Sequence, residues 1–194
     1  MALDQKTLTL AAHGYASERE RLTVELAISG RRLLEEAAGN GIFGGPIPGL
    51  ITLKGAENLK ARYAAAAAEL IRSGKSRDLR YSMRLEDNLV EAFGIIIAAD
   101  VAQIEQDVKG RLLPFAQMTG VIDDVRKILT VADASALAKA RSDFEHYVAQ
   151  LKAEGDRRAV SSRTIWMNRL FGFLSGGAVV ALIGYIWSAT HPLH

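Results

Sequence analysis

The chain has 194 residues, no cysteine, and a nearly balanced set of 24 basic and 22 acidic residues. The missing cysteines exclude disulfide bonds and thiolate chemistry, and they fit a reducing compartment. Nearly half of the residues are hydrophobic and only four are proline, a composition that favours helices and predicts an all-α fold.

Residues 4–38 carry the repeat of an amphipathic helix. Apolar side chains recur at spacings of three and four residues, or their sums, and include Tyr15, Leu22 and Leu26. Arg19 and Ser29 interrupt this stripe. The run Gly39–Asn40–Gly41 is a strong stop signal, so we expect one long helix that ends at this point.

Residues 39–55 combine turn residues with apolar ones. They contain six glycines and two prolines, which predict a loop, but also Phe43, Ile47 and Leu50. Two interpretations remain open at this stage. The segment is either a loop folded onto its own apolar side chains, or a hydrophobic contact for a partner or a bilayer surface.

The pattern of apolar residues predicts four further helices in the body of the chain. These cover residues 56–73, 76–109, 120–131 and 134–153, with Asp133 as the N-cap of the last. The helix over 76–109 is the second long one, and Met83 belongs to its predicted inner face. Residues 92–99 are apolar all round and predict a surrounded core helix. Residues 1–156 therefore predict a helical bundle with two long helices.

Few residues in this body suggest catalysis. Gly74–Lys75–Ser76 resembles the end of a phosphate-binding loop, but Glu69 stands where that motif needs its first glycine. The four histidines lack the companions of a metal site, so we expect no metal and no cofactor. Asp100 follows the most apolar stretch. It is either a buried functional carboxylate, or a structural residue that lies at the helix edge or pairs with an arginine.

Four basic residues are grouped around the start of the predicted helix over 76–109: Lys75, Arg77, Arg80 and Arg84. They are followed by Glu86, Asp87 and Glu91, and opposed charges on one helix usually form a solvated, ion-paired face. Binding of acidic lipid or RNA is the less favoured alternative. No other feature of the sequence indicates a nucleic-acid partner.

The segment from Leu170 to Trp187 contains eighteen residues and no charge. About 20 apolar residues in a helix cross the hydrocarbon core of a bilayer, so this segment with its flanks predicts a single membrane span. Residues 188–194 would form a short tail beyond it. The sequence thus predicts a tail-anchored protein whose partner is the lipid bilayer.

A basic collar precedes the predicted span. Residues 1–156 hold 20 basic and 22 acidic residues, whereas residues 157–169 hold only the arginines Arg157, Arg158, Arg163 and Arg169. Because such an excess stays on the cytoplasmic side, we expect a cytoplasmic body, with a bacterial inner membrane favoured over an organelle. Trp166, Tyr185 and Trp187 stand near the two ends of the span, as interfacial aromatic residues do.

The predicted span also carries small residues at a spacing that favours helix pairing. Gly172 and Gly176 form a G-x-x-x-G motif, and Gly184 falls on nearly the same face. Small residues let two membrane helices approach closely. We therefore expect self-association through this face, or packing against another membrane protein.

Three classes of function are compatible with these features. The favoured one is a non-catalytic scaffold or accessory subunit of a membrane-associated assembly, because no catalytic motif is present. An oligomerising effector that perturbs the bilayer is the first alternative, suggested by the glycine-rich span and the apolar segment 42–53. A membrane-bound enzyme without a readable motif is the second alternative.

Overall fold

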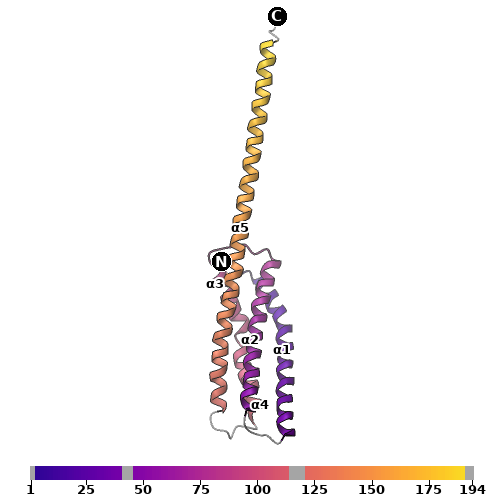
Figure 1. Cartoon of the computed structure of the whole chain (residues 1–194), viewed down its shortest axis with the longest axis vertical. Helices are drawn as coiled ribbons and strands as arrows, with labels where there is room; N and C mark the ends of the chain where they lie inside the picture. Colours follow the sequence, from indigo (N-terminus) through magenta and orange to yellow (C-terminus); the bar gives the residue numbers. More distant parts are fainter. Residues whose placement is uncertain (1–2, 41–45, 114–120, 191–194) are drawn as a thin grey trace. The chain divides into compact units, whose positions relative to one another are not determined.

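The described part of the chain forms five helices and no strand (Figure 1). The computed structural model describes the backbone of residues 3–40, 46–113 and 121–190, and the side-chain surroundings of these residues except 121–122 and 168–190. The helices are α1 (Gln5–Gly39), α2 (Ile47–Ser76), α3 (Leu85–Ile97), α4 (Asp100–Leu112) and α5 (Val121–Thr190). The all-α prediction is confirmed for the part of the chain that is described.

Contacts between residues divide the chain into two units. The first is Met1–Ala149, and it holds α1 to α4 with the first part of α5. The second is Gln150–His194, which holds the rest of α5. The predicted bundle therefore belongs to the first unit, and the collar and predicted span belong to the second.

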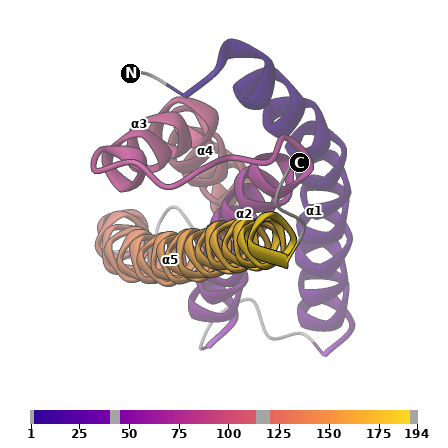
Figure 2. The same cartoon turned by 90° about the horizontal axis from the view of Figure 1, so that it is seen from above.

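Helix α2 is the centre of the first unit. It buries 14 of its 30 residues, against seven of 35 in α1. It packs against α1, α3 and α4, and it lies between α1 and the α3–α4 pair when the unit is seen from above (Figure 2). A helix with neighbours on several sides needs apolar or internally paired residues on most of its surface, which is what α2 has.

Aromatic side chains connect α2 to α3 and α5. Tyr63 and Phe93 pack edge to face with ring centroids 5.4 Å apart, and Phe93 and Phe144 do so at 5.6 Å. Phe93 and Phe144 are fully buried. Edge-to-face pairs stabilise a core by about 0.5–1.5 kcal/mol beyond their buried area, so this cluster helps to fix α3 and α5 on α2.

The predicted helix over 4–38 is confirmed by α1. Asp4 begins it, because its side chain accepts a hydrogen bond from the backbone N–H of Lys6 at 3.4 Å. Tyr15, Leu22 and Leu26 are buried, as their spacing predicts. The helix ends at Gly39 with Asn40 as its C-cap.

The predicted loop over 39–55 is wrong from Ile47 onward, because α2 already begins there. Pro46 precedes the helix and Pro48 lies in its first turn, where the missing N–H of proline has no intrahelical partner to lose. Gly55 is a packing residue rather than a turn residue. A Cβ atom placed on it would lie 2.5 Å from Cγ2 of Val108 in α4.

The predicted helix over 76–109 is also wrong, because two shorter helices replace it. Residues 77–84 form a connection in which Asp78 has a left-handed φ of 48°, and a second break separates α3 from α4. Met83, expected inside, is 94% exposed in this connection. The apolar stretch 92–99 is not surrounded either, since Ile95 is 60% exposed.

The predicted helices over 120–131 and 134–153 are a single helix, α5. Asp133 is not an N-cap. It lies within α5 and accepts a hydrogen bond from the Tyr63 hydroxyl of α2, so its polar side chain serves a contact between helices. Gly155 does not break α5, because one glycine lowers helix stability by only about 1 kcal/mol.

We predict opposite effects for two glycine-to-alanine substitutions in helices. Gly55→Ala should lower the free energy of unfolding by about 1–3 kcal/mol, because the new methyl group meets the buried Val108 side chain. Gly94→Ala, at an exposed position in α3 with nothing within 4 Å, should raise it by roughly 0.5–1 kcal/mol. Urea denaturation followed by circular dichroism measures both. Equal effects would contradict the close α2–α4 approach.

Candidate functional site

The collar residues that are described lie on the surface of α5. Arg157, Arg158 and Arg163 are exposed, and Trp166 is 67% exposed. Val160, Ile165 and Met167 are exposed beside them, so cationic and apolar side chains share this stretch. That mixture is typical of segments at a membrane interface, where arginines contact headgroups and aromatic rings lie at headgroup level.

The predicted span lies outside the residues whose side chains are described. This applies to Arg169, Tyr185 and Trp187, and to the three glycines Gly172, Gly176 and Gly184. The backbone of this stretch belongs to α5, which continues to Thr190. Among the residues searched, which exclude this stretch, no helix has the length and apolarity that crossing a membrane requires.

The predicted partner contact is divided by the start of α2. Phe43 lies outside the described residues. Ile47 is the first residue of α2 and is half-buried, and Leu50, one turn later, is 41% exposed. Leu53 is exposed as well, so the first turns of α2 present apolar side chains to solvent. A role for these residues in partner binding stays a prediction.

A buried ionic network joins α1, α2 and α4. At its centre Oδ1 of Asp100 accepts from Nε of Arg19 at 2.8 Å and from Nη1 of Arg62 at 3.3 Å. Its Oδ2 accepts a hydrogen bond from the Tyr15 hydroxyl. Asp100 and Arg62 are both fully buried, and we call these four residues the Asp100 network. Of the two interpretations of Asp100, pairing with arginine is the one observed.

Neighbouring polar side chains complete the network. Arg62 donates from Nε to Oδ1 of Asn58 at 3.0 Å and from Nη2 to Oγ1 of Thr23 at 2.8 Å. Arg19 donates from Nη2 to Oε1 of Gln103 at 2.6 Å. Buried charges are tolerated only when they are paired and hydrogen-bonded, and the buried Arg62 guanidinium meets that condition, while Arg19 is partly exposed.

Two tyrosine hydroxyls are held by carboxylates in this unit. Burial raises the pKa of Tyr15 above its usual value, and the hydrogen bond to Asp100 raises it further. Burial and the hydrogen bond to Asp133 likewise raise the pKa of Tyr63. Both hydroxyls therefore stay protonated and act as donors that connect α1 to α4 and α2 to α5. Neither is prepared to act as a base.

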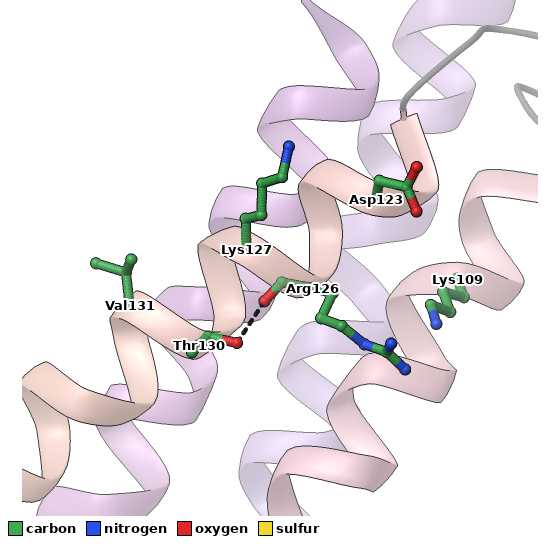
Figure 3. Close-up of a pocket in the computed structure, with 6 residues that line it drawn as sticks. All are labelled: Lys109, Asp123, Arg126, Lys127, Thr130 and Val131. Carbon is green, nitrogen blue, oxygen red and sulfur yellow. Dashed lines mark hydrogen bonds between the residues drawn. The ribbon is translucent and has the colours of Figure 1, made fainter.

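An open groove of about 660 Å³ lies between α4 and α5 (Figure 3). Its lining residues are Lys109, Asp123, Arg126, Lys127, Thr130 and Val131. Its cations are paired, since Lys109 and Arg126 both contact Glu105 and Lys127 contacts Asp124. The Thr130 hydroxyl donates to the backbone carbonyl of Arg126 at 2.8 Å, so it is not placed against a base. The described residues that line the groove form no arrangement for nucleophilic catalysis.

No metal-binding arrangement occurs among the described residues, where no group of three or more histidine, aspartate or glutamate side chains comes together. A scan against protein-family models finds none that matches the chain, and searches of the curated proteins and of the solved structures also find no match.

Sequence reasoning found Asp100 but missed Arg62 and Tyr15 as its partners. The sequence contained two signals, each an arginine at a position where the helix pattern predicts an apolar residue. Arg19 interrupts the apolar stripe of α1, and the structure places it on Asp100. Arg62 gave a comparable signal, because it lies between Leu59 and Tyr63 on the buried side of α2. The pattern marks such residues as unusual, but only the packing of three helices shows which charges meet.

We predict that Asp100→Ala lowers the free energy of unfolding by about 3–5 kcal/mol, because it leaves the buried Arg62 guanidinium without its carboxylate. The matched control is Asp143→Ala, at an exposed position in α5, which should change stability by less than about 0.5 kcal/mol. Denaturant unfolding of both variants gives the comparison. A loss below about 1 kcal/mol for Asp100→Ala would show that the Asp100 network does not hold the three helices together.

Proposed function

We propose that this chain is a tail-anchored membrane protein whose helical unit acts as a non-catalytic scaffold or accessory subunit of a membrane-associated assembly. The observation that carries the proposal is the uncharged run of eighteen residues from Leu170 to Trp187. As part of the continuous helix α5 this run would measure about 27 Å, close to the hydrocarbon thickness of about 30 Å.

The collar supports the anchor and its orientation. Three of its four arginines are exposed on α5, and no acidic residue occurs from 157 to 169. The seven residues after Trp187 contain no lysine or arginine. By the positive-inside rule, the helical unit lies on the cytoplasmic side, with a bacterial inner membrane as the favoured location.

A scaffold needs surfaces for partners, and the first unit has candidates. Large apolar side chains are exposed on α1 at Val24 and Ile28, and on α2 at Leu50 and Leu53. Their exposure supports a contact with another protein more than it supports a catalytic role. We retain Phe43, Ile47 and Leu50 as the proposed partner contact, with its helical part now assigned to α2.

We predict that the full chain floats with lipid vesicles and that its C-terminus crosses the membrane. The chain has no cysteine, so single cysteines can be introduced without background. In intact cells a membrane-impermeant thiol reagent should label Ser188→Cys from outside and should leave Ser142→Cys, an exposed position in α5, unlabelled.

The same two cysteine variants also test whether the proposed topology or the anchor itself is wrong. The reverse labelling pattern would invert the proposed topology. Labelling of neither position in intact cells but of both in lysate, with the chain absent from the membrane fraction, would contradict the anchor itself.

We also propose that the span associates with a second copy through Gly172, Gly176 and Gly184. Gly176→Ile should weaken association of the span in a membrane two-hybrid assay, because a bulky side chain would separate the backbones. Packing energies between membrane helices are about 1–2 kcal/mol, so a several-fold loss of signal is expected. Val179→Ala is the control. A loss for Val179→Ala with none for Gly176→Ile would place the contact on another face.

A further inference from the structure

The connection between α2 and α3 concentrates positive charge on the surface of the first unit. Lys75, Arg77, Arg80 and Arg84 are all exposed, and Asp78 is the only acidic residue among residues 75–84. None of the three arginines forms an ion pair within the described part of the chain. We call residues 75–84 the basic loop. The ion-paired helical face expected for these cations is therefore not what the structure forms.

The basic loop also exposes apolar side chains. Met83 is 94% exposed and Tyr81 is exposed beside it. Exposed cations interleaved with exposed apolar side chains match the two layers of a membrane surface, because lysine and arginine contact anionic headgroups while methionine and tyrosine enter the region below. A solvated loop would gain nothing from a fully exposed methionine.

The basic loop lies where α5 leaves the first unit. Lys75 Nζ is 5.9 Å from the centroid of the Tyr147 ring, and a Cβ atom on Gly74 would lie 2.9 Å from the Tyr147 hydroxyl. Tyr147 is two residues before Ala149, the last residue of the unit. The chain ends that flank residues 41–45 and 114–120 lie at the opposite end of this unit (Figure 1).

The proposed anchor keeps this end of the unit close to a bilayer. Between Ala149 and Leu170 the chain rises by about 30 Å as a helix, whatever direction that helix takes. Because this helix is about 30 Å long, the basic loop stays within about that distance of the bilayer, and it reaches the headgroups where the helix tilts toward the membrane plane. The opposite end of the unit is farther from the residue at which the helix leaves, so the same helix does not hold it within this distance of the bilayer.

We infer that the basic loop is a second membrane contact, which binds anionic lipid headgroups through Arg77, Arg80 and Arg84 and inserts Met83 at the interface. This inference rests on the proposed anchor, because without it the loop has no reason to meet a bilayer. The contact would also make the position of the helical unit depend on the lipids of the membrane. The anionic lipid content of the membrane sets how the helical unit is held.

The test uses the full chain with one introduced cysteine, labelled with a polarity-sensitive dye, in two kinds of vesicle. One kind is phosphatidylcholine alone, and the other contains phosphatidylglycerol as well, with a quencher attached to a lipid in both. The dye on Met83→Cys should be quenched at least about twofold more in the anionic vesicles. The dye on Leu113→Cys, exposed at the opposite end of the unit, should not respond.

Charge reversal provides the matched variant. Arg77→Glu with Arg80→Glu, added to Met83→Cys, should abolish the difference between the two vesicle types and leave flotation intact. Raising the salt concentration should reduce the difference in the parent chain, because exposed charges are screened.

The outcomes separate this inference from the proposed function. If the chain floats with both vesicle types but the two dyes respond alike, the basic loop is not a lipid contact and the anchor stands. If the chain floats with neither, the anchor fails and the inference fails with it. A Met83→Cys dye that responds to added RNA or to an acidic protein, and not to anionic vesicles, would assign the loop to that partner and overturn the lipid contact.

Discussion

The first unit depends on one buried carboxylate that three helices share. Asp100 comes from α4, Arg62 from α2, and Arg19 and Tyr15 from α1, and each meets the others only when the helices are in one register. A buried ion pair adds little net stability compared with apolar packing, but a mismatched one is costly, by about 3–5 kcal/mol. The Asp100 network therefore selects one arrangement of helices over slipped alternatives that would bury the same apolar area.

The rest of the unit is built around α2 by close contacts of different kinds. Gly55 lets α4 approach at Val108, and the aromatic cluster of Tyr63, Phe93 and Phe144 connects α3 and α5. Tyr63 also donates to Asp133, so α5 is fixed by a polar contact as well as by its buried face. The basic loop and the collar take no part in these internal contacts, and both carry exposed arginines.

Both proposals concern these surface charges. The collar combines exposed arginines with Trp166, and the basic loop combines exposed arginines with Met83. The two segments are far apart in the sequence, yet each presents cations and apolar side chains together, which is the chemistry of an anionic bilayer surface. The Asp100 network pairs its charges inside the first unit, while these two segments carry exposed cations, and this distribution supports the proposed scaffold at a membrane.

The sequence by itself determined the helical class, the extent of α1, and the uncharged run and arginine collar, because composition, periodicity and local charge are properties of neighbouring residues. It failed where a distant contact overrode a local signal. Glycines and prolines at 46–55 suggested a loop. Pro46 and Pro48 are compatible with the start of a helix, however, and Gly55 is required by the close packing of Val108 in α4. No glycine or proline marks the break at residues 98–99, and Asp133 resembled a cap although its partner is Tyr63. Only the tertiary structure decided these points, and with them which arginines Asp100 would meet, because each depends on helices that the chain brings together from far along its length.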